Sequence, residues 1–248
     1  MITRLNRLSA EDPSLPRLLV IGDSISGNYD ASLRHALAGK VNVYHPPESA
    51  GSTRIGRKRI RSWLGAFREE GRGWDAITFN FGHWNPTGPR NEPETRKLKK
   101  YAYKSGLEYI ISEMELTGAR LIWVTTAPIP RGFGVGDEGF ASGKSALINE
   151  WADEVMVQHP EISVVDHYGF VVEDPLYSVW WTRRDVHFTP TLAEPLGRAI
   201  AREVLRVLKI GGDIPPARPL SRAEVENQHC CLPLETYERM SREAQVVD

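Results

Sequence analysis

Three residues with the chemistry of an acyl-transfer site lie far apart in this chain: Ser24, Asp185 and His187. Ser24 follows an apolar run in "LLVIGDSIS", and His187 lies in "RRDVHFTP" with Asp185 two residues before it. A serine hydroxyl becomes a nucleophile when a histidine accepts its proton and an acid orients that histidine. The sequence therefore raises the hypothesis of a Ser24–His187–Asp185 set, provided that the fold brings the two segments together.

The same residues also have ordinary structural interpretations. Ser24 or Ser26 could cap a helix, which is a frequent role of serine, and His187 could be a structural histidine. The G-x-S-x-G motif of α/β-hydrolases is not matched, because "GDSIS" has serine at its fifth place. The local sequence around Ser24 leaves both interpretations open.

The pattern of apolar residues predicts an α/β fold. Short runs rich in β-branched residues predict five strands, at 18–21, 41–44, 76–81, 121–126 and 162–165. Amphipathic segments predict helices at about 30–38, 56–70, 94–117, 141–158 and 190–209. In 94–117 the expected buried stripe consists of Leu98, Tyr101, Leu107, Ile110, Ile111 and Met114. Strands that alternate with helices, without tight hairpins, predict a parallel sheet covered on both faces.

Ligands of such sheets bind beyond the carboxyl ends of the strands. This rule brings the loops 22–29 and 167–189, which contain Ser24 and His187, to one edge of the sheet. The loops 45–55, 82–93 and 127–140 reach the same edge. We interpret 127–140 as a mobile flap, because its "GVGDEG" is too far from the preceding strand to form a dinucleotide-binding turn.

Two of these loops carry candidate partners for an oxyanion or a substrate. Gly51 would let its backbone N–H approach an oxyanion, although a plain turn glycine is the alternative. The stretch "FNFGHWN" offers Asn85 as an amide donor and His83 and Trp84 as substrate contacts. The alternatives are that Trp84 packs under the loop and that Asn85 is a turn residue.

The composition is that of an ordinary globular protein, with 248 residues and a net charge of −1. This charge balance gives no reason to expect nucleic acid or a membrane surface as a partner. Cys230 and Cys231 are adjacent, and no cluster has the spacing of a metal site. The N-terminal stretch lacks the apolar core of a signal peptide. We therefore expect no metal and a cytoplasmic location, or a secreted one if a leader was removed.

Taken together, "GDS", "AGSTRIG", "FNFGHWN" and "VHFTP" resemble, in this order, the blocks of the SGNH (GDSL-type) hydrolase family. The resemblance implies that Ser24 is the nucleophile, Gly51 a backbone oxyanion donor and His187 the base. It also implies a three-layer α/β/α sandwich, flavodoxin-like, with a five-stranded parallel sheet. We expect one such domain at 17–210, an N-terminal arm at 1–16 and an appendage at 211–248 with a short helix and a tail.

The chain departs from the family pattern at two places. The third block usually reads Gly-x-Asn-Asp, whereas here Trp84 has the asparagine position and Asn85 follows it. The oxyanion donors are then the amides of Ser24 and Gly51, either alone or with Asn85 or the Trp84 indole. The last block usually reads Asp-x-x-His, whereas Asp185 is one residue closer to His187. Either a triad with Asp185 or a Ser–His dyad helped by a backbone carbonyl fits this spacing.

The resulting expectation is a serine esterase that removes short acyl groups, mainly acetyl, through an acyl-enzyme on Ser24 and without a cofactor. The stretches "PPESAG" and "DVHFTP" resemble a bacterial branch associated with carbohydrate esters. Candidate sugar platforms are the tryptophans Trp63, Trp84, Trp180 and Trp181, of which Trp63 is expected in the core. The alternatives are an O-acyltransferase with the same serine and a non-catalytic binding protein with a decayed site. The oligomeric state is left open.

Overall fold

The computed structural model of this chain describes residues 11–46, 48–67, 71, 73–88, 91–128, 144–174, 186–188 and 190–216. Asp185 and most of the expected flap and C-terminal appendage lie outside these residues, as do Trp180 and Trp181. The expectations for them therefore stay predictions. Among the helices of the described part, none is long and apolar enough to cross a membrane.

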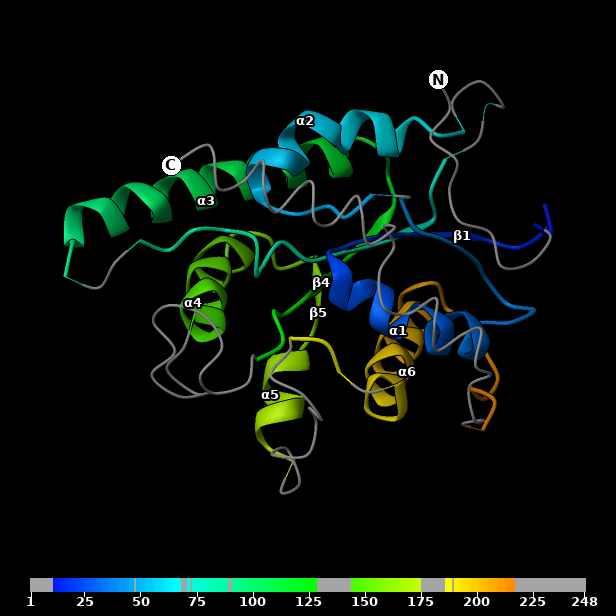
Figure 1. Cartoon of the computed structure of the whole chain (residues 1–248). Helices are drawn as coiled ribbons and strands as arrows, with labels where there is room; N and C mark the ends of the chain where they lie inside the picture. The colour runs from blue at the N-terminus through cyan, green and yellow to red at the C-terminus, as the bar shows by residue number, and fades with distance from the viewer. Residues whose placement is uncertain are drawn as a thin grey trace.

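The five predicted strands form one parallel sheet, as expected (Figure 1). Their order across the sheet is β2-β1-β3-β4-β5, and every neighbouring pair is parallel. The strands are β1 (Arg17–Ile21), β2 (Asn42–Tyr44), β3 (Ala76–Phe79), β4 (Arg120–Val124) and β5 (Ser163–Val165). This is the strand order of flavodoxin-like folds, which bind ligands where the order reverses, between β1 and β3.

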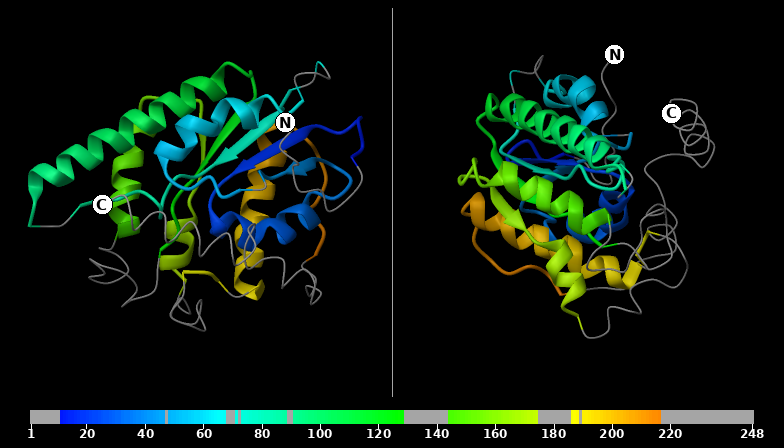
Figure 2. Two further views of the ribbon diagram at one scale, coloured as in Figure 1. Left: turned by 45° about the horizontal axis from the view of Figure 1, so that its top comes forward. Right: turned by 90° about the vertical axis from the view of Figure 1, so that its left-hand side faces the viewer.

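In the described part of the chain, six helices surround the sheet: α1 (Ser24–Ala36), α2 (Thr53–Leu64), α3 (Pro93–Glu115), α4 (Lys144–Met156), α5 (His167–Val172) and α6 (Pro190–Val207). One apolar core joins α1 and α6 to one face of the sheet, and a second core joins α2, α3 and α4 to the other face. Figure 2 shows α2 and α3 on the opposite side of the sheet from α1 and α6. The sheet covered on both faces, which the alternating pattern predicts, and the three-layer sandwich, which the resemblance implies, are therefore confirmed.

The helix α1, which carries Ser24, begins earlier than the sequence suggested. We expected a helix from about residue 30, because serine, glycine and asparagine in "SISGNYD" favour turns over helices. The structure has α1 from Ser24, with Asp23 as its N-cap, and residues 24–29 are all buried. Packing against the rest of the fold therefore outweighs weak local propensity, and it places Ser24 on the first turn of the helix.

Two further expectations need correction. The segment 167–189, expected to be a loop, begins with the short helix α5. In α3, Leu98 and Tyr101 are 69% and 74% exposed, whereas the rest of the expected stripe is buried. Figure 1 shows the reason, since the N-terminal part of α3 extends well beyond the sheet and beyond the other described helices. Trp63 is fully buried, as expected.

Candidate active site

The structure brings Ser24 and His187 into hydrogen-bond contact although they are 163 residues apart. The distance between Ser24 Oγ and His187 Nε2 is 2.7 Å. Ser24 is the first residue of α1, and His187 lies directly before α6, so the packing of these two helices sets the contact. When the imidazole carries its proton on Nδ1, the Ser24 hydroxyl donates to Nε2. This is the arrangement in which a histidine can remove the proton of an attacking hydroxyl.

Asp23 caps the helix that carries Ser24. Its Oδ1 accepts a hydrogen bond from the backbone N–H of Ile25, at 3.0 Å, and its backbone carbonyl accepts from those of Ser26 and Gly27. The N–H of Ser24 itself has no acceptor among the described residues. A free N–H at a helix N-terminus can stabilise a developing negative charge. Ser24 therefore presents a hydroxyl in contact with His187 and a backbone N–H at the start of α1.

Gly51 lies in a loop that is tied to the same place. The backbone N–H of Ala50 donates to the carbonyl of Gly22 at 2.9 Å, which holds the loop after β2 beside the loop after β1. Gly51 has φ of +61°, in the left-handed region where a side chain is strained. Its N–H, like that of Ser24, finds no acceptor in the described part of the chain. The position thus combines a left-handed conformation with an N–H that has no acceptor among the described residues, and the oxyanion role expected for it stays a prediction.

Asn85 lies nearby, but its side chain is fully engaged. Its Oδ1 accepts from the backbone N–H and the hydroxyl of Thr53, both at 3.0 Å, and its Nδ2 donates to the carbonyls of Phe81 and Gly82. The amide expected to face an oxyanion therefore faces the backbone. Because Thr53 is two residues from Gly51, Asn85 connects the loop after β3 to the Gly51 loop.

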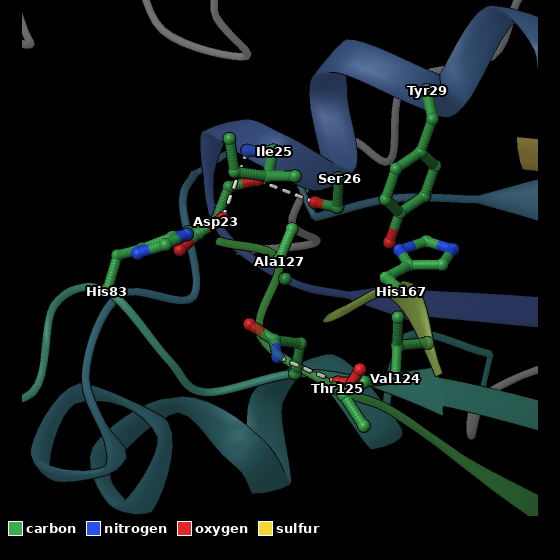
Figure 3. Close-up of a pocket in the computed structure, with 11 residues that line it drawn as sticks. Asp23, Ile25, Ser26, Tyr29, His83, Val124, Thr125, Ala127 and His167 are labelled. Atoms are coloured by element: carbon green, nitrogen blue, oxygen red, sulfur yellow. Dashed lines mark hydrogen bonds between the residues drawn. The ribbon is translucent and has the colours of Figure 1, made fainter. Parts of the chain in front are cut away.

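His83 and Lys144 add polar groups beside Asp23, in the loop after β1. The Lys144 ammonium donates to the backbone carbonyl of His83 at 2.5 Å. Figure 3 shows the His83 ring beside the Asp23 side chain. Burial lowers the pKa of His83, opposed by the charge of Asp23, and burial also lowers the pKa of Lys144. His83, predicted as a substrate contact, thus lies at the site, and Trp84 beside it is partly exposed.

A second serine–histidine pair lies close to Ser24 but is closed to substrate. Ser26 Oγ is 2.6 Å from His45 Nε2, and His45 Nδ1 donates to the carbonyl of Pro46 at 2.7 Å. Ser26 and His45 are only 2% and 1% exposed. Burial lowers the pKa of His45, which favours its neutral form. The pair therefore fastens the first turn of α1 to the end of β2, a role that the sequence analysis missed.

Comparison with known proteins supports the fold. The sequence matches no model of a known protein family and no curated protein. A GDSL-like lipase from Bacteroides thetaiotaomicron superposes with a TM-score of 0.57 at 11% identity, over 81% of this chain and 93% of that one. An acetyl-xylooligosaccharide esterase from Geobacillus gives 0.57 at 16%, over 81% and 97%. The catalytic domain of a peptidoglycan O-acetyltransferase from Streptococcus pneumoniae gives 0.52 at 16%, over 82% and 99%.

The chain has the SGNH-hydrolase fold. Within this SGNH fold, Ser24 follows β1, Gly51 follows β2, and His83 and Asn85 follow β3. His187 reaches the same edge from the start of α6.

A buried histidine near the loop after β1 gives a prediction for stability. His167 lines a small pocket with Asp23, Tyr29 and Thr125 (Figure 3), and it contacts the Tyr29 ring edge-on. Burial lowers the pKa of His167 to about 4. The unfolded chain binds this proton near pH 6.5 and the folded chain does not. The contribution of His167 to the free energy of unfolding is therefore fully present above pH 6.5. It is lost as the pH falls towards 4, by about 3 kcal/mol.

Replacing His167 with glutamine isolates this contribution. Glutamine keeps an N–H for the carbonyl of Leu196, which His167 Nε2 contacts at 3.1 Å, but it does not titrate. We expect urea unfolding to show a shallower loss of stability between pH 7 and pH 4 in His167→Gln than in the wild type. His45, His83 and His159 titrate in both proteins, so they cancel in the comparison. Equal pH dependence of the two proteins would contradict the prediction.

Proposed function

We propose that this protein is a serine esterase with Ser24 as nucleophile and His187 as base. The single observation that carries the proposal is the 2.7 Å contact between Ser24 Oγ and His187 Nε2 at the carboxyl edge of the sheet. Ser24 Oγ bonds to the ester carbon while its proton passes to His187. The imidazolium then protonates the departing alcohol. Water attacks the acyl-enzyme, gives a proton to His187 and releases the acid, and the serine recovers that proton.

Each tetrahedral intermediate carries its negative charge on the former carbonyl oxygen. The backbone N–H groups of Ser24 and Gly51 donate hydrogen bonds to this oxygen and stabilise the charge. Both are free of acceptors among the described residues, and the Ala50–Gly22 bond holds their loops together. Asn85, with its amide occupied, acts on this hole through Thr53, by fixing the start of α2. We assign the hole to the backbone amides of Ser24 and Gly51 alone, without Asn85 or the Trp84 indole.

We further propose that the substrates are short acyl esters, chiefly acetyl, on a carbohydrate. Support comes from the resemblance of "PPESAG" and "DVHFTP" to carbohydrate esterases. The fold is also similar to that of a protein described as an acetyl-xylooligosaccharide esterase. Acetate release from acetylated oligosaccharides, compared with p-nitrophenyl acetate, butyrate and octanoate, tests this class. A preference for octanoate, with no acetate released from any sugar, would exclude it.

An O-acyltransferase is the second candidate, because the fold is also similar to that of a peptidoglycan O-acetyltransferase domain. The same Ser24 acyl-enzyme would then pass its acyl group to a sugar hydroxyl instead of water. Product analysis with an acetyl donor, with and without an acceptor sugar, separates the two. An acetylated sugar at the expense of free acetate would favour the transferase, and acetate alone favours the esterase.

The acid behind His187 is tested by replacing Asp185 with alanine. In a triad, loss of the acid leaves the imidazole poorly oriented and costs about 10⁴-fold in kcat. A dyad supported by a backbone carbonyl predicts a loss below about tenfold, roughly 1.4 kcal/mol. We expect the larger loss, measured as kcat for p-nitrophenyl acetate. A loss below tenfold would remove Asp185 from the site and leave the esterase proposal intact.

A further inference from the structure

One face of α1 carries polar residues at four-residue intervals: Ser24, Asn28 and Ser32. Residues four apart lie one turn apart on the same side of a helix. Ser24 contacts His187, and the next residue on this face, Asn28, contacts Phe188. The nucleophile and Asn28 therefore hold two consecutive residues of the base loop from two consecutive turns of one helix.

The contact of Asn28 is short and buried. Its Oδ1 accepts a hydrogen bond from the backbone N–H of Phe188 at 2.7 Å, and Asn28 is only 1% exposed. The Phe188 side chain is equally buried, in the core that contains Leu33 and Leu196. The residue that follows the base is thus fixed both through its backbone and through its ring, which leaves His187 little freedom to move.

Only one of the two polar atoms of the Asn28 side chain, Oδ1, has a hydrogen-bond partner among the described residues. Its Nδ2 is buried and has no hydrogen-bond partner among the described residues. A buried N–H group without a partner costs free energy, so a residue that served packing alone would be better apolar. The acceptor oxygen is the group that finds a partner, and that partner belongs to the base loop.

The third position on this face brings α6 close to α1. A Cβ on Gly197 would lie 2.1 Å from Ser32 Oγ and 2.8 Å from the carbonyl oxygen of Tyr29. Only glycine lets the two helices approach this closely. Since α6 begins just after the base loop, α1 fixes that loop from both sides: through Asn28 at Phe188 and through Ser32 at Gly197.

We propose that Asn28 is a positioning residue that holds the imidazole of His187 at hydrogen-bond distance from Ser24. It does not touch the reacting atoms, and it acts through the backbone of Phe188. The inference rests on the proposed esterase function. A misplacement of about 1 Å of a reacting group can cost about 100-fold in rate, so the loss of this single contact has a measurable kinetic effect.

The test compares three variants by steady-state hydrolysis of p-nitrophenyl acetate. Asn28→Leu keeps the branched skeleton of the side chain and removes the acceptor, whereas Asn28→Asp keeps the acceptor oxygen. The matched control is Asn42→Leu at the start of β2, the opposite end of the sheet. There the Asn42 side chain likewise bonds to backbone groups, those of Asp12 and Leu15.

We expect Asn28→Leu to lower kcat by about 100-fold with little change in KM, and Asn42→Leu to keep kcat within about twofold. Asn28→Asp should recover kcat to within about tenfold of the wild type.

The positioning role is overturned if Asn28→Leu keeps kcat within about threefold, or if Asn42→Leu loses as much. If Asn28→Leu does not fold, the smaller variant Asn28→Ala, which also removes the acceptor, is measured in its place, and a kcat within about threefold of the wild type overturns the role. A wild type that neither hydrolyses esters nor reacts with a fluorophosphonate at Ser24 would refute the proposed function, and the positioning role with it. An active wild type with an active Asn28→Leu would refute only the positioning role.

Discussion

Replacing Ser24 with alanine is expected to lower kcat/KM for p-nitrophenyl acetate by about 10⁴-fold or more. The reason is that the variant loses the atom that forms the acyl-enzyme, whereas the backbone N–H groups of the oxyanion hole remain. The fold should survive, because α1 is capped by Asp23 and buried along most of its length without help from the Ser24 hydroxyl. Thermal unfolding and circular dichroism of the variant check this.

Ser26→Ala is the matched control for Ser24→Ala. Ser26 lies two residues further on and also contacts a histidine, at 2.6 Å, but this pair is buried. Its loss leaves His45 Nε2 without its Ser26 partner and should cost about 1–3 kcal/mol of stability. We expect Ser26→Ala to keep kcat/KM within about tenfold once folded. Hydrolysis that survives in Ser24→Ala and disappears in Ser26→Ala would contradict the assignment.

Replacing His187 with alanine is expected to be nearly as costly, about 10⁴-fold or more in kcat. Without the imidazole, no group removes the proton of Ser24, and a neutral hydroxyl is a poor nucleophile. Because serine and histidine act as a unit, the double variant Ser24→Ala/His187→Ala should lose little more than either single variant. Steady-state kinetics of the three variants measures this. Losses that multiply in the double variant would mean that the two residues act independently.

The sheet was predictable because its strands carry strong local signals. The β1 run Leu18–Ile21 is apolar throughout, and all five residues of β1 are buried, as in a central parallel strand. Parallel strands then bring their carboxyl ends to one edge, which was enough to place Ser24, Gly51 and His187 together. The resemblance to SGNH hydrolases pointed to the same residues.

The contacts that hold the site were not predictable in the same way. Asn28 was missed because its segment resembled a turn, and only burial against α6 makes it a helix. If the helix start at Ser24 had been recognised, the spacing of four residues between Ser24 and Asn28 would have been the signal. The roles of His45 and Asn85 depend on partners across the fold, Ser26 and Thr53, which no local pattern reveals.

The central claim, that Ser24 is the nucleophile activated by His187, is tested most directly by labelling with a fluorophosphonate probe. Peptide mass spectrometry of the labelled protein identifies the modified serine. We predict one adduct, on Ser24, formed rapidly in the wild type and strongly slowed in His187→Ala. This result would also exclude a non-catalytic protein with a decayed site. An unlabelled wild type, an adduct on Ser26, or equal labelling of the His187→Ala variant would contradict the account.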